Sequence, residues 1–221
     1  MHIPPRADEY KDPMTRSLDQ WCRLYISRRI RLCCAIALLA VAGAIWSFFQ
    51  YFDMPRITAK KIEARELSHI VILYRHAERC DRSDSQCLGN LAGITVRGGR
   101  KAAQLGEQMR QLFSSDYSLM SSNTLRTQQS ASSFAGVMPV IVNKELDSNE
   151  CTLQTFPAFI NAVIHNPAHK MQIVFTHSEC LEFFAAHFGH KTMTAKYLDN
   201  LVLDIDRHHH VKVLGTLALD H

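Results

Sequence analysis

The chain lacks a C-x-x-C pair, an internal repeat and any low-complexity stretch in its 221 residues. The first absence argues against a cysteine-based zinc site, and the other two exclude repeat and disordered architectures. Residues 53–221 hold 18 basic and 17 acidic side chains. This part therefore has no charge excess that would favour a nucleic-acid partner. The length and composition predict one globular domain of ordinary size plus an additional segment.

The additional segment lies at the N-terminus. Residues 32–49 contain no charged side chain and have the length of a bilayer span. Four arginines precede this run and five aromatic residues gather at its far end: Arg23, Arg28, Arg29, Arg31, Trp46, Phe48, Phe49, Tyr51 and Phe52. The positive-inside rule predicts a basic cytoplasmic segment over 1–31 and export of the chain after residue 52. Residues 32–52 are expected to be a transmembrane anchor, or a cleaved signal peptide with alternate alanines at 40–44 as its cleavage site.

Four cysteines lie in the part expected to be exported: Cys80, Cys87, Cys151 and Cys180. An even number of cysteines in an oxidising compartment favours disulfides. Cys80 and Cys87 would close a short local loop, and Cys151 would then pair with Cys180. Four free buried thiols are the alternative.

From residue 69 onward, apolar runs of strand length alternate with helical patterns. Strands are predicted over residues 69–74, 117–120, 137–142, 171–175, 201–205 and 211–214. Helices are predicted over 95–113, 124–134 and 155–165 and directly after residue 177. Such alternation predicts an α/β fold, a three-layer α/β/α sandwich with a mainly parallel central sheet. Residues 53–66 are expected to be a linker that runs into a short helix, and residues 67–221 to be the folded domain.

Three predicted strand ends lead into side chains suited to phosphate chemistry. His76 directly follows a buried strand and lies between Arg75 and Arg79. Nearby positive charges lower the pKa of a histidine, and arginine binds phosphate bidentately. Arg126 lies in the first turns of a predicted helix, where anions are favoured, and His177 ends a later strand. If these strands are neighbours, the five side chains converge beyond their carboxyl ends, where ligands of such sheets bind.

These pieces resemble the histidine phosphatase superfamily, which is phosphoglycerate mutase-like. Its members have an Arg-His-Gly opening after the first strand, a helix beginning L-T-x-x-G, the pattern S-x-x-x-R-T-x-Q-T, and a late strand ending in histidine. The counterparts here are RHAER at 75–79, GITVRGGRKA at 93–102, SSNTLRTQQSA at 121–131 and THSECL at 176–181. The resemblance implies the histidine phosphatase fold and a phosphomonoesterase that needs no metal or cofactor. Ala77 departs from the usual glycine.

Within the superfamily, the chain resembles most the lipopolysaccharide core heptose(II)-phosphate phosphatases. The likeness includes RHAERCDRS, QCL, GITV, SSNTLRT, FTH and the late YLDNLV at 197–202. It implies a phosphorylated sugar of the lipopolysaccharide core as substrate and a periplasmic, membrane-attached enzyme with no obligate protein partner. The alternatives are a histidine phosphatase for another phosphomonoester or a phosphohistidine protein, and a non-catalytic membrane-anchored phosphate-binding protein.

The resemblance also implies roles for the site residues. His76 is the expected nucleophile, and Arg75, Arg79, Arg126 and His177 are expected to bind the phosphoryl oxygens.

Related enzymes use a carboxylate after the third arginine as general acid, and Glu150 is the expected one. Glu145 and Asp147 are its rivals, and Glu78 is a further candidate that more readily faces a basic neighbour. Three adjacent histidines at 208–210 invite a metal interpretation. Because neighbouring strand residues point to opposite faces, a solvated strand end or turn is expected there instead.

Overall fold

The computed structural model describes residues 36–43, 54–63, 69–114, 116–164 and 171–219. Met1–Phe52 and Asp53–His221 form two compact units. In the first unit, residues 36–43 are helical. The predicted segment 1–31 and most of the predicted span 32–52 lie outside the described residues. Within the described residues, no helix combines the length and the apolar character that a membrane crossing requires.

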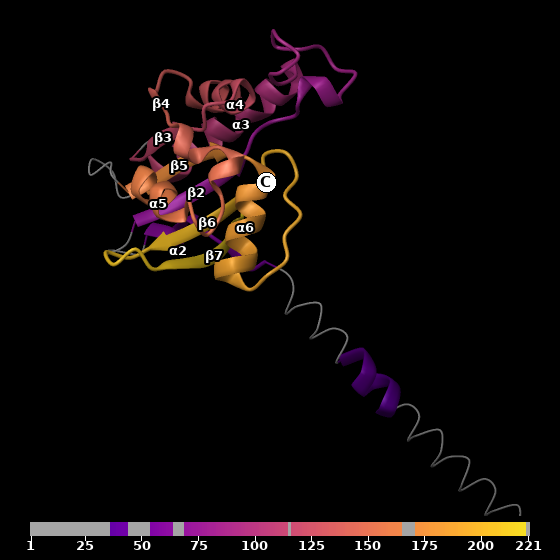
Figure 1. Cartoon of the computed structure of the whole chain (residues 1–221). Coiled ribbons are helices and arrows are strands. Elements are labelled where there is room, and N and C mark those ends of the chain that lie inside the picture. The colour runs from indigo at the N-terminus through magenta and orange to yellow at the C-terminus, as the bar shows by residue number, and fades with distance from the viewer. Residues whose placement is uncertain (1–35, 44–53, 64–68, 115, 165–170, 220–221) are drawn as a thin grey trace, which may run out of the picture. The chain divides into compact units, whose positions relative to one another are not determined.

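The second unit is built on one seven-stranded sheet in the order β1-β7-β6-β2-β5-β3-β4 (Figure 1). The strands are β1 (Arg56–Ile57), β2 (His69–Arg75), β3 (Ser118–Ser121), β4 (Val140–Val142), β5 (Met171–Thr176), β6 (Asn200–Ile205) and β7 (Val211–Leu217). Four neighbouring pairs are parallel, namely β1–β7, β2–β5, β3–β5 and β3–β4. Only β6 runs against its neighbours, β2 and β7. The predicted mainly parallel sheet is confirmed.

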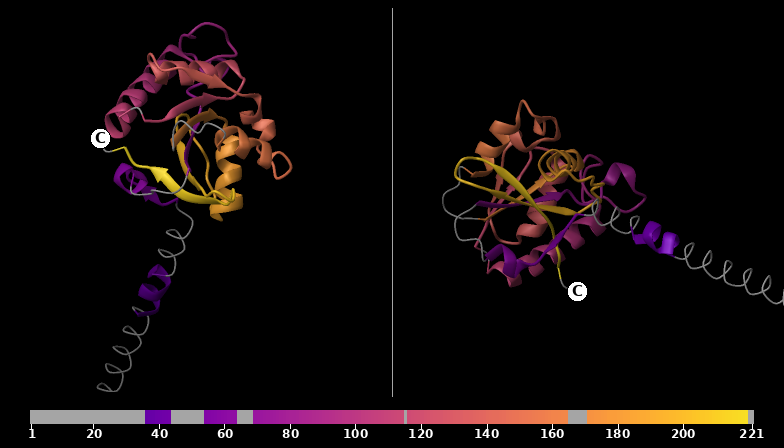
Figure 2. Two further views of the ribbon diagram at one scale, coloured as in Figure 1. Left: turned by 90° about the vertical axis from the view of Figure 1, so that its left-hand side faces the viewer. Right: turned by 90° about the horizontal axis from the view of Figure 1, so that it is seen from below.

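Helices cover both faces of this sheet (Figures 1 and 2). One apolar cluster joins α2 (Ala59–Glu63), α3 (Val96–Phe113) and α4 (Leu125–Ala135) to one face. A second cluster joins α5 (Phe156–Ile164) and α6 (Ser178–Gly189) to the other. The division follows the strand alternation, because Ile72 and Tyr74 of β2 belong to the first cluster whereas Val71 and Leu73 belong to the second. The three-layer sandwich is therefore confirmed.

Two segments differ from the sequence expectation. Residues 53–66, expected to be a linker that runs into a short helix, contain that helix as α2 but also form β1, and Ile57 and Ile62 are buried in the core of the domain. The strand expected over 137–142 begins only at Val140. The chain turns first, since Gly136 has a φ of +62° and the amide of Met138 donates to the carbonyl of Ala135 at 3.1 Å.

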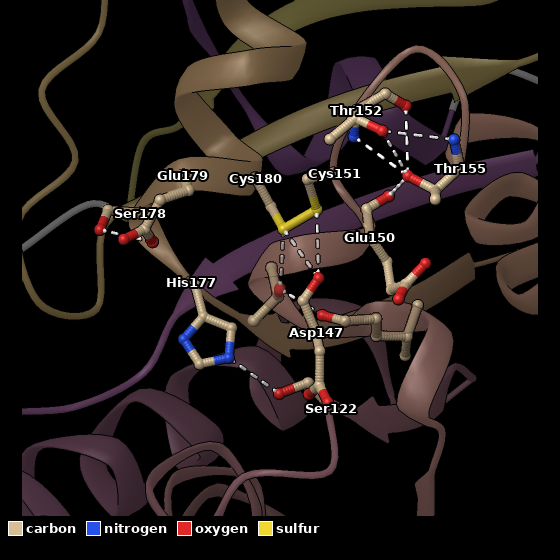
Figure 3. Close-up of a disulfide and its surroundings, with 12 residues drawn as sticks. Ser122, Asp147, Glu150, Cys151, Thr152, Thr155, His177, Ser178, Glu179 and Cys180 are labelled. Carbon is tan, nitrogen blue, oxygen red and sulfur yellow. Dashed lines mark hydrogen bonds between the residues drawn. A yellow bond between two sulfur atoms is a disulfide. The ribbon is translucent and has the colours of Figure 1, made fainter.

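Both expected disulfides are present. The first disulfide joins Cys80 to Cys87, which is seven residues further along the chain, with 5.3 Å between the Cα atoms. Cys151–Cys180 joins the end of the short 3-10 helix η3 (Ser148–Glu150) to the first turn of α6, with 5.0 Å between the Cα atoms (Figure 3). Because His177 immediately precedes α6, this second disulfide fixes a loop beside one of the predicted site histidines.

Candidate active site

The carboxyl ends of β2, β5 and β3 lie side by side. Arg75 pairs with Thr176, and Ser121 pairs with Phe175. β2 and β3 lie on either side of β5, and the residue that follows each of them continues the pairing with β5. The amide of His76 donates to the carbonyl of Thr176, and the amide of Ser122 donates to the carbonyl of Phe175, each at 3.0 Å. The predicted neighbourhood of the three strand ends is therefore present.

The two predicted histidines meet at this edge. The ring centroids of His76 and His177 are 5.5 Å apart, and the residues are only 3% and 2% exposed. His76 Nδ1 lies 2.8 Å from the carbonyl oxygen of Ala77, which can only accept, so Nδ1 carries the proton. Burial lowers the pKa of His76 to about 3; the Ala77 hydrogen bond opposes this as the second-largest effect, and the charges of His177, Arg126 and Arg75 add to the lowering. His76 is thus a neutral imidazole with its lone pair at Nε2.

His177 has the opposite tautomer. Arg126 Nη2 lies 3.3 Å from His177 Nδ1, and because arginine can only donate, Nδ1 accepts. His177 Nε2 therefore carries the proton and donates to Ser122 Oγ at 3.1 Å (Figure 3). Ser122 Oγ in turn lies 2.8 Å from Thr127 Oγ1. Burial, and then the charge of Arg126, lowers the pKa of His177 to about 4.

Arg75 and Arg126 bring unsatisfied donors to the same edge. Arg75 Nη1 donates to the carbonyl oxygen of Ala195 at 2.6 Å, and its guanidinium lies 4.3 Å from the ring centroid of Tyr197. The Nε atoms of Arg75 and Arg126 are buried and have no hydrogen-bond partner among the described residues. A buried donor without a partner is costly, and an anion with several oxygens would satisfy both. Sequence reasoning named Tyr197 only as the first residue of the YLDNLV stretch and gave it no role in the site.

Arg79 lies three residues after His76, and its charge adds to the effect of burial in lowering the pKa values of Arg126 and His177. Its guanidinium is held by Asp81, through Nε to Oδ1 at 2.8 Å and through a second, shorter contact from Nη2. The sequence analysis did not foresee this pair. The other guanidinium nitrogen, Nη1, is not used by Asp81, so Arg79 keeps donors for an anion.

Ala77 fits where the superfamily usually has glycine. Its amide donates to Ser130 Oγ at 2.9 Å, and its side chain is fully buried. The first turn of α3 presents Gly98 to it, and a Cβ on Gly98 would lie only 3.2 Å from that of Ala77. The space for the alanine methyl group is thus provided by a glycine on the facing helix.

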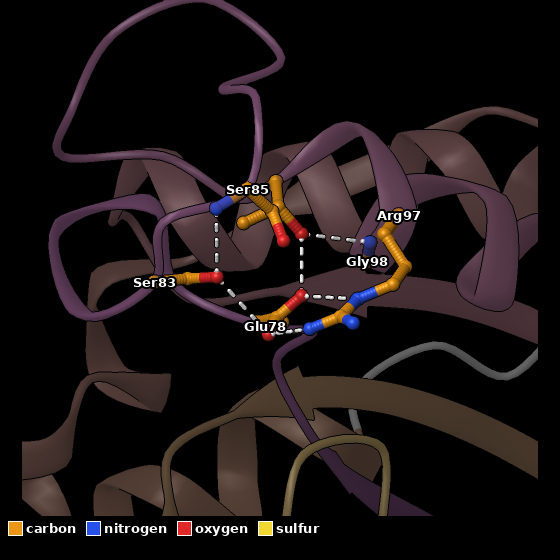
Figure 4. Close-up of polar contacts among 6 residues, drawn as sticks. Glu78, Ser83, Ser85, Arg97 and Gly98 are labelled. Carbon is orange, nitrogen blue, oxygen red and sulfur yellow. Dashed lines mark hydrogen bonds and ion pairs between the residues drawn. The ribbon is translucent and has the colours of Figure 1, made fainter.

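The candidate general acids differ in their surroundings. Glu150 forms no hydrogen bond with either histidine among the described residues, so its role stays a prediction. Asp147 accepts from the amide of Asn123 at 2.8 Å, and its charge slightly opposes the lowering of the His177 pKa by burial and Arg126. Glu78 faces a basic neighbour, as expected: Arg97 forms a bidentate ion pair with it (Figure 4).

The histidines at 208–210 lie in the turn between β6 and β7, as expected. The amides of His208 and His210 donate to Asp206 Oδ1, and His210 Nδ1 lies 2.9 Å from Asp206 Oδ2. Within the described part of the chain, no group of three or more His, Cys, Asp or Glu side chains is placed to hold a metal ion.

Acid should destabilise the folded domain through the two site histidines. Both pKa values fall from the ordinary 6.5, to about 3 and about 4, so the unfolded chain binds more protons at intermediate pH. Their stabilising contribution is complete above pH 6.5, declines as the pH falls below that value, and is fully lost once the pH has fallen through 4 for His177 and 3 for His76. Between pH 6.5 and 4.5, each histidine should lower the free energy of unfolding by ~2 kcal/mol. Urea unfolding at several pH values measures this loss.

His76→Asn should reduce the pH dependence of stability, because the asparagine amide can replace the Nδ1 donor but does not titrate. His209→Ala, in the exposed turn, is the matched control and should leave the slope unchanged. An identical slope in His76→Asn and the wild type would contradict a buried neutral His76.

Comparison with known proteins supports what the geometry indicates. No family model matches the chain. It is 36% identical over 195 residues to the lipopolysaccharide core heptose(II)-phosphate phosphatase of Escherichia coli O7:K1 (strain IAI39 / ExPEC), which covers 85% of this chain and 92% of that protein. The protein of that name from Escherichia coli strain K12 / DH10B matches with the same identity and coverage.

Solved structures show the same fold at low identity. The protein histidine phosphatase SixA complexed with tungstate aligns with a TM-score of 0.53 and 14% identity, over 67% of this chain and 96% of SixA. A phosphoglycerate mutase from Bacillus anthracis str. Sterne aligns with a TM-score of 0.53 and 11% identity, over 69% and 94%. The chain has the histidine phosphatase fold and belongs to the lipopolysaccharide core heptose(II)-phosphate phosphatase family, a family of phosphomonoester hydrolases.

Proposed function

We propose that this protein removes a phosphate from heptose(II) of the lipopolysaccharide core through a phosphohistidine at His76. The observation that supports this most directly is the pairing of a neutral imidazole, with its lone pair at Nε2, with the buried partnerless Nε atoms of Arg75 and Arg126. A nucleophile beside desolvated cationic donors suits attack on a phosphate dianion. The 36% identical relatives, named for this substrate, support the choice of sugar.

In the first step, the Nε2 lone pair of His76 attacks phosphorus while the bond from phosphorus to the sugar oxygen breaks. The sugar oxygen keeps that electron pair and takes a proton from a general acid. Arg75, Arg79 and Arg126 bind the phosphoryl oxygens and stabilise the charge spread over them in the loose transition state. His177 supplies a further donor when its Nε2–H group donates to a phosphoryl oxygen instead of to Ser122 Oγ.

In the second step, water attacks the phosphorus of phosphohistidine and the N–P bond breaks, which restores neutral His76. The carboxylate left by the first step takes a proton from that water. Since the arginines provide the positive charge, the reaction needs no metal in this account.

We propose Glu150 as the general acid, because it precedes Cys151, which the disulfide ties to the first turn of α6 directly after His177; Asp147, which accepts from the Asn123 amide, is its rival. Glu150→Gln should lower kcat for a sugar phosphate by about 10²–10⁴-fold and act far less on p-nitrophenyl phosphate, whose leaving group needs no proton. Asp147→Asn is the matched comparison. A larger, leaving-group-dependent loss in Asp147→Asn would transfer the role to Asp147.

We further propose a periplasmic location with attachment through residues 32–52. The apolar run with its arginine-rich flank supports membrane insertion. The two disulfides support an oxidising compartment, because thiols are kept reduced in the cytosol.

The substrate assignment is tested on isolated lipid A–core. Mass analysis of core from cells with and without the gene should show one additional phosphate group on heptose(II) when the gene is absent. The purified full-length protein should remove that phosphate in the presence of EDTA, and His76→Ala should not. An unchanged core together with rapid hydrolysis of other phosphomonoesters, or of a phosphohistidine protein, would redirect the function to those substrates.

A further inference from the structure

A small pocket of about 100 Å³ lies next to the catalytic edge. Its lining residues come from the loop after β2, the first turns of α3 and the loop before β6: Glu78, Arg97, Gly98, Lys101, Tyr197 and Leu198. Tyr197 is shared with the site, since its ring centroid is 5.8 Å from that of His76 and 4.3 Å from the guanidinium carbon of Arg75. A substrate whose phosphate lies against His76 therefore has this pocket immediately beside it.

Glu78 does not make the pocket acidic. Its carboxylate accepts hydrogen bonds from Arg97, from Thr95 Oγ1 at 2.8 Å and from Ser83 Oγ at 3.2 Å (Figure 4). The Arg97 hydrogen bond, in particular, lowers the pKa of Glu78 to about 2. The charges of Glu78 and Arg97 thus compensate each other, and the pair holds the Arg97 guanidinium in a fixed place at the pocket wall.

Lys101 supplies the one charge of the pocket lining that has no counter-charge. It lies four residues after Arg97 on α3, so both side chains are on one helix face. Within the described residues, its ammonium group forms no ion pair or hydrogen bond, and the residue is exposed. The pocket therefore carries a net positive charge at the end provided by α3.

The remaining wall suits a sugar. A guanidinium has five N–H donors, and Glu78 uses only two of those on Arg97, whose side chain is 60% exposed. The unused donors can serve ring hydroxyl groups. Tyr197 and Leu198 provide apolar surface, and an aromatic face can pack on the C–H groups of a sugar ring.

We infer that this pocket binds the sugar of the substrate and that Lys101 recognises a second anionic group, a phosphate or a carboxylate, on that sugar. The inference rests on the proposed function, which makes the leaving group a sugar, and extends it to a dianionic or polyanionic substrate. Lys101 and Arg97 then determine specificity, whereas the phosphoryl chemistry stays with His76 and the arginines around it.

The test compares three compounds with the full-length protein: glucose 1,6-bisphosphate, glucose 6-phosphate and p-nitrophenyl phosphate. The wild type should have a KM about 10-fold lower or more for the bisphosphate than for the monophosphate, because a charge-assisted hydrogen bond is added. Lys101→Glu should abolish this preference while leaving kcat/KM for p-nitrophenyl phosphate within about 2-fold. 6-Phosphogluconate, with its carboxylate, shows whether a carboxylate replaces the second phosphate.

Arg100→Glu is the matched control, because it changes charge equally at the neighbouring exposed position but does not line the pocket. Equal preference in Lys101→Glu and the wild type, or equal losses in Lys101→Glu and Arg100→Glu, would overturn the inference. If the wild type hydrolyses none of these compounds and also leaves the phosphate on isolated lipid A–core, the proposed function fails. Calorimetric titration of the two glucose phosphates then still tests whether the pocket recognises a second anionic group. The wild type must bind the bisphosphate more tightly than the monophosphate, and Lys101→Glu must abolish that difference.

Discussion

Replacing His76 by alanine should reduce phosphatase kcat by about 10⁵-fold or more, because loss of a covalent nucleophile removes the whole two-step route. The groups around His76 keep its Nε2 atom unprotonated and therefore nucleophilic. Burial and adjacent positive charges keep the pKa of His76 near 3, and the Ala77 carbonyl fixes the proton on Nδ1. Steady-state hydrolysis of p-nitrophenyl phosphate at neutral pH measures the loss.

Folding must be separated from chemistry in that experiment, since His76 is buried. His76→Asn can keep the hydrogen bond to the Ala77 carbonyl and is the second variant, with circular dichroism and thermal unfolding measured for both. His209→Ala is the histidine control and should retain full activity. A correctly folded His76→Asn variant within about 10-fold of wild-type kcat would exclude His76 as the nucleophile.

Replacing Arg126 by alanine should reduce kcat/KM by about 10²–10³-fold, the usual cost of one donor that stabilises transition-state charge. Arg126 makes two separate contributions to the site. Its buried Nε is an available donor, and its Nη2 bond to Nδ1 sets the tautomer of His177. Without its positive charge, the pKa of His177 should also rise. Arg126→Lys should recover only part of the loss, because an ammonium group cannot replace the planar fork of a guanidinium.

The matched control for Arg126 is Arg100→Ala, on the exposed face of α3, which should change kcat/KM by less than 2-fold. Inhibition by vanadate should weaken in parallel with the loss of activity in Arg126→Ala, since the same donors bind both anions. A loss below about 3-fold in Arg126→Ala would mean that Arg126 does not contact the transferred phosphoryl group.

The elements that position the site were predictable because their signals are local. A six-residue apolar run identified β2, and the helix predicted over 95–113 is α3, which Thr95 caps by accepting at Oγ1 from the amide of Gly98 at 2.9 Å. The strand order that makes β5 the neighbour of both β2 and β3 is not fixed by these local signals and was expected only conditionally.

What could not be predicted depends on contacts between distant segments. β1 has only two residues, and its partner β7 lies about 160 residues further along the chain, so no periodicity marks it. Tyr197 belongs to a loop whose place over Arg75 arises only in three dimensions. The Gly98 that accommodates Ala77 was read as part of a motif, and its packing role depends on how α3 meets the loop after β2.

The covalent intermediate is the most direct test of the account. A radiolabelled phosphomonoester, mixed with the full-length protein in EDTA and quenched in denaturant at alkaline pH, should leave label on one peptide that contains His76. The label should be acid-labile and absent from His76→Ala. Label on a serine, aspartate or cysteine, or on His177, would contradict a mechanism that begins at Nε2 of His76.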